Sequence, residues 1–321
     1  MTHQHGFPVS VQRSKTGMLV TLRAIEAIAF QDHFIEETLR RVHGVETTVP
    51  LLAAGLGSSF AKNMSPAGII FHVSKCGSTL ISQLLKHTRQ AVIYSQPPAL
   101  SDLLMPPQDL DIKELVAAVQ TLGMLFSRHA NGPYILKSES WNVLFCDVLK
   151  AAFPDTPWIF CIRDPIEVAV SNMEDDDPPT WYKYLNSDPN PFAVHLKRKL
   201  RSDDTPGSYV ALFYAEFCDA ILRLNQADGK IISYEDLPRA AWEVVAPHFG
   251  LRLSEADMRA MTEAAKIYSK SSYGGEFSFM PDAAQKRQRA SCDVKSAADR
   301  LAKPSFQQLL SQRYAANFAG R

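Results

Sequence analysis

The sequence predicts an α/β fold with three layers, in which a central parallel sheet lies between two layers of helices. Five short apolar runs are bounded by turn residues and have the length of buried strands. They lie at residues 68–73, 91–94, 133–137, 158–162 and 230–233. Longer segments with helical spacing separate them, and this alternation is typical of a parallel sheet that helices cover on both faces.

The segments between and after the predicted strands have apolar residues at helical spacing. Helices are expected at residues 78–87, 112–129, 142–152, 166–173, 209–225, 238–249 and 254–269. Before the first strand, residues 23–43 carry Ile25, Ile28, Phe34 and Leu39 at mostly helical spacing. We therefore predict a helical N-terminal extension, residues 1–60, packed on an α/β domain of residues 61–321.

Composition is that of a globular protein, with 46% hydrophobic and 21% charged residues in a chain of 321. Lys and Arg together number 34, as do Asp and Glu, so no strong basic field favours a nucleic acid partner. Five cysteines without C-x-x-C spacing predict reduced thiols in the cytoplasm and no metal site. The N-terminus has no apolar signal region, and the absence of a long apolar run predicts no membrane span.

Residues 68–82 read as a strand, a turn of small residues and a helix, which is the arrangement of a phosphate cradle. In such a unit the backbone N–H groups of the turn and the positive end of the helix dipole face one point. Gly77 permits a close approach of the backbone, Lys75 supplies a charge, and Ser78 and Thr79 supply hydroxyl groups. The nucleotide triphosphatase loop places its lysine after the last glycine, whereas here Lys75 precedes Gly77.

Residues 74–79, Ser-Lys-Cys-Gly-Ser-Thr, resemble the Pro-Lys-Ser-Gly-Thr-Thr loop of the sulfotransferase family. Residues 158–172 supply a second match, because a strand ends in Arg163 and a helix brings Ser171 eight residues later. Residues 134–140 are similar to the Leu-Lys-Thr-His segment of cytosolic sulfotransferases, with Lys137 on the lysine and Glu139 at the position of the histidine. A weaker match at residues 232–237 includes Tyr-Glu-Asp.

This resemblance implies a P-loop nucleotide-hydrolase-like fold and 3′-phosphoadenylyl sulfate as the donor of a sulfuryl group. It implies no metal, and a small-molecule hydroxyl or amine as the acceptor. The residues expected at the phosphosulfate are Lys75, Cys76, Gly77, Ser78 and Thr79, and those expected at the 3′-phosphate are Arg163 and Ser171. The family also closes a late basic loop over this phosphate, which suggests Lys286, Arg287 and Arg289, although these residues could instead be an exposed basic helix start. Lys75, Lys137 and Glu139 are the implied catalytic residues.

Each of these residues also has a structural interpretation. Lys75 could be a solvated lysine, although a cation at a helix N-terminus is disfavoured unless an anion binds there. Lys137 could extend from a sheet edge to solvent, and Glu139 could be bound in a salt bridge to Lys137. Arg163 could pair with Asp164, its neighbour in the chain.

Other residues near the predicted site favour structural interpretations. His72 is expected to be packed in the core, and the acidic run 174–177 to be a solvated face of a loop, although residues 174–191 could instead form a substrate lid. In tyrosylprotein sulfotransferases a glutamate after the second strand acts as base, but the comparable Gln96 cannot accept a proton at neutral pH. Two alternatives to a sulfotransferase remain, a magnesium-dependent kinase with an atypical phosphate loop and a nucleotide-binding protein without transfer activity.

Overall fold

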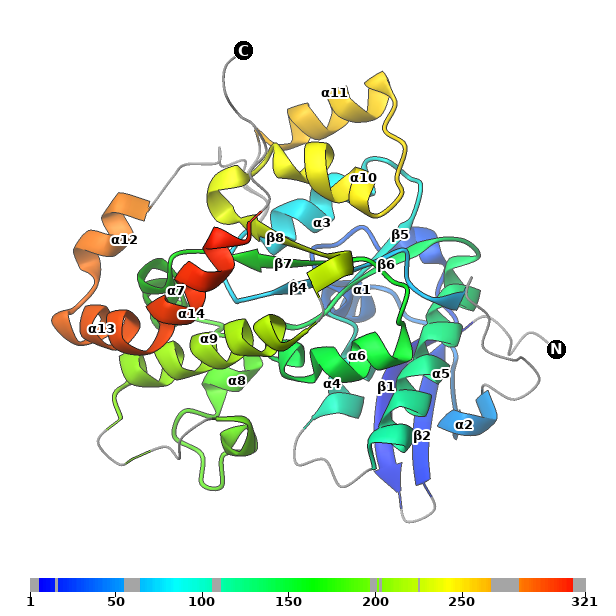
Figure 1. The fold of residues 1–321 in the computed structure, drawn as a ribbon. Coiled ribbons are helices and arrows are strands. Elements are labelled where there is room, and N and C mark those ends of the chain that lie inside the picture. Colours follow the sequence, from blue (N-terminus) through cyan, green and yellow to red (C-terminus); the bar gives the residue numbers. More distant parts are fainter. Residues whose placement is uncertain are drawn as a thin grey trace.

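The computed structural model describes residues 6–14, 17–54, 64–105, 111–196, 201, 204–224, 226–266 and 283–313. Within them, five parallel strands form the central sheet: β4 (Gly68–His72), β5 (Val92–Ser95), β6 (Tyr134–Lys137), β7 (Trp158–Ile162) and β8 (Gly229–Ser233). Their spatial order is β5-β6-β4-β7-β8 (Figure 1). The first strand of the sheet therefore lies in its centre, and the turn that follows it opens between two neighbours. The predicted α/β fold and its five strands are confirmed.

Helices cover both faces of this sheet (Figure 1). On one face lie α3 (Ser78–Lys86), α10 (Ala246–His248) and α11 (Glu255–Ala264), and on the other lie α5 (Ile112–Ala130), α6 (Cys146–Ala152) and α9 (Pro206–Arg223). The remaining helices of the domain are α4 (Pro98–Leu104), α7 (Pro165–Met173), α8 (Thr180–Lys183), α12 (Ala283–Arg289), α13 (Cys292–Ala297) and α14 (Lys303–Ser311). The predicted helix at 142–152 begins as a 3-10 turn at Ser140–Phe145, and the one at 238–249 contains a π-helical turn at Ala241–Val245.

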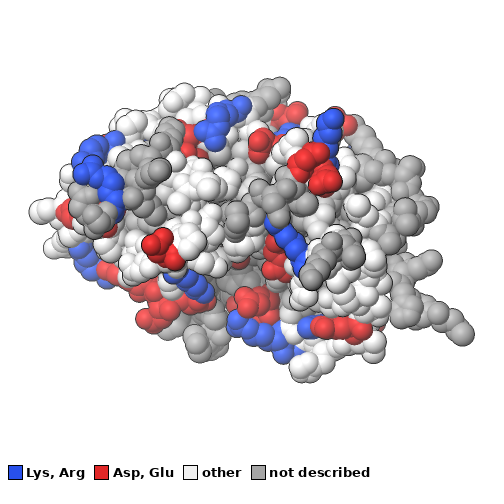
Figure 2. Space-filling model, turned by 90° about the horizontal axis from the view of Figure 1, so that it is seen from below, with Lys and Arg blue, Asp and Glu red and all other residues white. Residues whose placement is uncertain are grey.

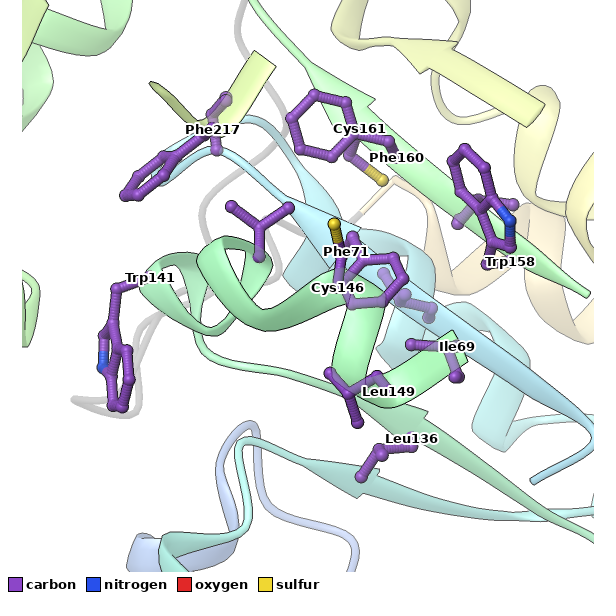
Figure 3. Packing of buried hydrophobic residues seen from close by; sticks show 14 of the residues in the cluster. Ile69, Phe71, Leu136, Trp141, Cys146, Leu149, Trp158, Phe160, Cys161 and Phe217 are labelled. Atoms are coloured by element: carbon purple, nitrogen blue, oxygen red, sulfur yellow. The ribbon is translucent and has the colours of Figure 1, made fainter. Parts of the chain in front are cut away.

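The core lies between the sheet and these helices because both faces of the strands are apolar. Every residue of β4 and of β7 is buried. Figure 3 shows Cys146 and Leu149 of α6 directed toward Ile69 and Phe71 of β4. Burial on both sides explains why these strands read as continuous apolar runs in the sequence.

The N-terminal segment differs from the helical extension that was predicted. It forms an antiparallel sheet of β1 (Phe7–Ser14), β2 (Gly17–Arg23) and β3 (Glu46–Pro50), with the short helices α1 (Ile35–Arg41) and α2 (Leu51–Ala54). The predicted helix at 23–43 was wrong except for α1. Tertiary contacts hold the turn before α1, because the Asp32 carbonyl accepts hydrogen bonds from Gln83 and Lys86, and its carboxylate accepts one from Thr38 Oγ1 at 2.6 Å.

This N-terminal sheet packs beside α4 and α5 (Figure 1). Phe7 of β1 lies in an aromatic group with Phe30, Tyr94 and Phe126. The backbone N–H of Val11 donates to Asp102 Oδ2 at 3.0 Å. α1 begins close to the carboxyl ends of the central strands, because the ring of its N-cap residue Phe34 lies against Lys137 at the end of β6. None of the helices within the described ranges is long and apolar enough to cross a membrane.

Candidate active site at the phosphate turn

The predicted phosphate turn connects β4 to α3 and has two residues with left-handed backbone. Gly77 has φ +85° and precedes Ser78, the first residue of α3. A Cβ atom at this glycine would lie 2.5 Å from Leu237 Cδ1 and 3.0 Å from Tyr234 Cδ2, so a larger residue would have to displace the Leu237 side chain in addition to adopting a positive φ. Lys75 has φ +58°, which is rare for a residue with a side chain. Such strain in a turn at a helix start is typical of a functional loop.

The side chains of the turn have different environments. Ser78 and Thr79 are buried, and the Cys76 thiol points inward and donates to the Val73 carbonyl at 2.8 Å. The Lys75 ammonium forms an ion pair with Asp175, from the acidic run that was expected to be solvated. That expectation was therefore wrong for Asp175, because the loop after α7 folds back onto the turn.

Lys137, at the end of β6, is completely buried. Its ammonium donates to Thr79 Oγ1 at 3.1 Å and lies 4.8 Å from the centre of the Phe34 ring. The alternative in which Lys137 extends from an edge to solvent was wrong, because β6 lies between β5 and β4. A buried ammonium next to the second residue of α3 places positive charge beneath the phosphate turn.

Glu139 follows two residues later and is partly buried. Its carboxylate accepts hydrogen bonds from Trp141 Nε1 and Thr180, and its backbone N–H donates to Asn142 Oδ1 at 3.0 Å. Burial raises the pKa of this carboxyl, against the hydrogen bonds from Trp141 and Thr180, which lower it. A carboxyl with a raised pKa and a fixed orientation is suited to accept a proton near neutral pH.

Arg163 follows the end of β7 and is 5% exposed. Its charge partner is Glu167, four residues later in α7. Its Nε donates to Glu167 Oε2 at 2.8 Å, and its Nη1 donates to the Lys75 carbonyl at 3.3 Å. The guanidinium carbon lies 4.0 Å from the centre of the Tyr234 ring, in the weakly matching segment 232–237. The alternative that paired Arg163 with Asp164 was wrong, since the Asp164 carboxylate caps α7 instead.

Ser171 and the late basic residues gather around the same helix, α7. The Ser171 hydroxyl donates to the Glu167 carbonyl at 2.7 Å. Arg287 of α12 contacts both Asp164, at 3.3 Å, and Glu167, at 2.9 Å. In the same helix Arg289 pairs with Glu174 at 3.1 Å, and Lys286 is partly buried. In the described part of the predicted late basic loop, residues 283–289 thus form a helix, as the alternative for these residues has it, and α12 packs against α7, which carries Ser171. The earlier part of that loop lies outside the described residues.

A pocket of about 750 Å³ opens at the phosphate turn. The turn residues Lys75–Thr79 form one wall, together with His72, Gln96 and Glu139. His33, Phe34, Glu36, Glu37 and Arg40 from the segment of α1 form a second wall, and the loop from Asp175 to Lys183 forms a third. The structure thus brings Lys75 and Glu139 to one cavity, whereas Lys137, Arg163 and Ser171 are not among the described residues that line it.

Three contributors to the site were not found from the sequence: the α1 segment, Asp175 and Glu167. Arg163 precedes the N-cap residue of α7 and Glu167 lies in the first turn of that helix, so their four-residue spacing could have indicated the pair. A substrate lid was one interpretation of the loop of Asp175, and residues 175–183 do contribute to the pocket wall. No local pattern indicated the pairing of Asp175 with Lys75 or the contribution of the α1 segment, since these contacts join segments far apart in the chain. On the face shown in Figure 2, basic and acidic side chains are interspersed, as the equal numbers of the two charges suggest.

No protein-family model matches the chain, and no curated protein does. Solved structures similar to it include the sulfotransferase STF9 from Mycobacterium avium, with 13% identity, a TM-score of 0.48, and coverage of 80% of this chain and 79% of that one. The sulfotransferase domain from the Synechococcus PCC 7002 olefin synthase has 16% identity, a TM-score of 0.45, and coverage of 75% and 96%. Mouse sulfotransferase SULT7A1 complexed with PAP has 13% identity, a TM-score of 0.41, and coverage of 83% and 88%. Because all three TM-scores lie below 0.5, these likenesses are too weak to assign a function to the chain.

Proposed function

We propose that the protein is a sulfotransferase that moves a sulfuryl group from 3′-phosphoadenylyl sulfate to a hydroxyl or amine of a small molecule. The observation that carries the proposal is that Lys75 and Glu139 line one pocket. Lys75 lies in a strained glycine turn at the start of a helix. Lys75 is suited to an anionic donor and Glu139 to an acceptor that must lose a proton. Cytoplasmic location belongs to the same proposal.

In this mechanism the turn holds the 5′-phosphosulfate. The backbone N–H groups of residues 76–79 and the N-terminus of α3 face the phosphate, and the Lys75 ammonium neutralises the bridging oxygen. The buried Lys137 ammonium adds positive charge through its contact with Thr79, 3.1 Å from the hydroxyl oxygen. These charges stabilise the leaving phosphate as its negative charge grows.

Glu139 is the proposed general base. As the acceptor oxygen or nitrogen attacks sulfur, a new bond to sulfur forms and the bond between sulfur and the bridging phosphate oxygen breaks. The proton of the acceptor passes to the Glu139 carboxylate, and the products are the sulfated acceptor and adenosine 3′,5′-bisphosphate. Burial raises the pKa of Glu139, which increases its basicity for this step.

Arg163, Ser171 and the basic helix α12 are the proposed contacts of the 3′-phosphate. Arg163 and Arg287 both contact the buried carboxylate of Glu167, so two guanidinium groups already converge on one point of negative charge. A guanidinium binds phosphate through paired hydrogen bonds, which favours this assignment. Lys286 and Arg289 of the same helix are included in the proposal.

Thermal denaturation with nucleotides tests the proposed function. Adenosine 3′,5′-bisphosphate without metal should stabilise the protein, by about 2.7 kcal/mol at a hundredfold excess over its dissociation constant. ATP with magnesium should have a smaller effect. A clear shift with ATP and magnesium and none with the bisphosphate would favour a kinase instead, and binding of the bisphosphate without any transfer would favour a nucleotide-binding protein.

A further inference from the structure

The ammonium of Lys75 already has a counter-ion in the protein. Asp175 lies two residues after the end of α7, and its carboxylate pairs with Lys75 at the mouth of the phosphate turn. The two side chains are 21% and 26% exposed, so the pair is partly shielded from water. Both residues line the same pocket. The charge that would receive an anionic donor is therefore neutralised in this state.

Lys75 is held at both its backbone and its side chain. Its carbonyl accepts from Arg163 Nη1 at 3.3 Å, and its backbone has φ +58°. An anion that binds to the turn must either displace the Asp175 carboxylate or lie beside it. Displacement breaks an ion pair, and coexistence brings like charges close together, so Asp175 opposes binding in both cases.

The loop that carries Asp175 continues into the wall of the pocket. Asp177, Pro178, Pro179 and Thr180 line the cavity, and Thr180 forms a hydrogen bond with the Glu139 carboxylate. Asp175 and Thr180 therefore belong to one short loop that contacts Lys75 at one end and the proposed base at the other. This connection joins the donor end of the pocket to the end at which the acceptor would bind.

We propose that Asp175 is a resident counter-ion of Lys75 that the donor displaces on binding, and that this displacement shifts the 175–180 loop at the acceptor end. This inference rests on the proposed function. It assigns to Asp175 a role in setting donor affinity.

Calorimetric titration of the wild type, Asp175→Asn and Asp176→Asn tests the affinity. Asp176 is the matched control, because it is the exposed neighbour in the same loop and its charge does not line the pocket. Asp175→Asn should bind adenosine 3′,5′-bisphosphate roughly three- to tenfold more tightly, the range expected for removing one partly exposed carboxylate from a cation. Adenosine 5′-phosphate should gain by the same factor, since both ligands place a phosphate at Lys75. Asp176→Asn should match the wild type.

Hydrogen exchange of the loop amides tests the displacement. In the wild type, exchange at residues 175–180 should become faster when adenosine 3′,5′-bisphosphate binds, and in Asp175→Asn it should be fast without ligand. If the wild type binds the bisphosphate and Asp175→Asn binds it equally or less tightly, or if the ligand slows exchange in the loop, the inference is overturned while the proposed function stands. If none of the three proteins binds the bisphosphate, the proposed function fails and the inference fails with it.

Discussion

Replacement of Glu139 by Gln separates the chemical role of this carboxylate from its structural role. Glutamine has nearly the same shape, and its amide oxygen can still accept the hydrogen bond from Trp141 Nε1. Its amide nitrogen can donate to the Thr180 hydroxyl. The substitution therefore keeps these contacts and removes the negative charge together with the ability to accept a proton.

The expected loss of turnover follows from general-base catalysis, which contributes about 10²- to 10⁴-fold, or roughly 2.7–5.5 kcal/mol of transition-state stabilisation. The affinity for adenosine 3′,5′-bisphosphate should stay within about twofold of the wild type, because donor contacts are unaffected. The substitution should lower the activity but raise the stability of the folded state. Burial raises the pKa of Glu139, so the charged form destabilises the folded state by about 1.4 kcal/mol for each pKa unit of the shift.

The sign of the pH dependence follows from this raised pKa. A carboxyl with a higher pKa in the folded state reduces stability progressively as pH rises from its unfolded pKa to its folded pKa, and the loss is complete above that. Glu139→Gln should therefore melt at a higher temperature than the wild type at neutral pH, and at the same temperature below the unfolded pKa of Glu139. Wild-type turnover should fall as pH decreases through the raised pKa, and this acidic limb should be absent from the residual activity of the variant.

The assay is turnover with the sulfated donor and a range of small hydroxyl and amine acceptors, run beside thermal denaturation and calorimetric titration. Glu255→Gln is the control, since Glu255 is highly exposed at the start of α11. Normal turnover of Glu139→Gln would refute the assignment of Glu139 as base. A large fall in its melting temperature would show instead that the charge of Glu139 stabilises the fold.

Three further substitutions test the turn and the 3′-phosphate contact. Lys75→Ala should abolish transfer and weaken both adenosine 3′,5′-bisphosphate and adenosine 5′-phosphate by roughly ten- to a hundredfold in calorimetry, and an unchanged affinity for the 5′-phosphate would contradict its role. Gly77→Ala should destabilise the protein by about 1–3 kcal/mol more than Gly250→Ala in denaturant titrations. Both glycines have positive φ, but a Cβ atom would overlap a neighbouring atom, Leu237 Cδ1, only at Gly77. Arg163→Ala should weaken the bisphosphate roughly ten- to a hundredfold and the 5′-phosphate much less; equal losses would mean that its contact with the Lys75 carbonyl matters most.

The central sheet could be predicted because its strands are determined by short stretches of sequence. β7 has the predicted bounds, Trp158–Ile162, and the other four differ from prediction by one residue at one or both ends. An apolar run between turn residues has few structural choices once it is buried on both faces. The N-terminal segment was predicted less well. The helical spacing at residues 23–43 corresponds to a helix only at α1, and the strands on either side of it, β1, β2 and β3, were not predicted. In the fold β1 packs on α4 and α5, which are distant in the sequence.

The features of the site also fall into two groups, those that local sequence predicts and those that depend on tertiary contacts. Local sequence by itself determined the phosphate turn, because the order of Lys75, Gly77 and the helix after them is sufficient to place N–H groups and a charge at one point. Only the tertiary structure decided which groups these residues contact. Thr79 and Lys137 are 58 residues apart in the chain, and Lys75 and Arg163 are 88 apart. Contacts between such distant residues depend on how strands and loops pack. The spacing of hydrophobic residues does not indicate which partner a single charged residue will have. The pairing of Asp175 with Lys75 was therefore decided by the tertiary structure.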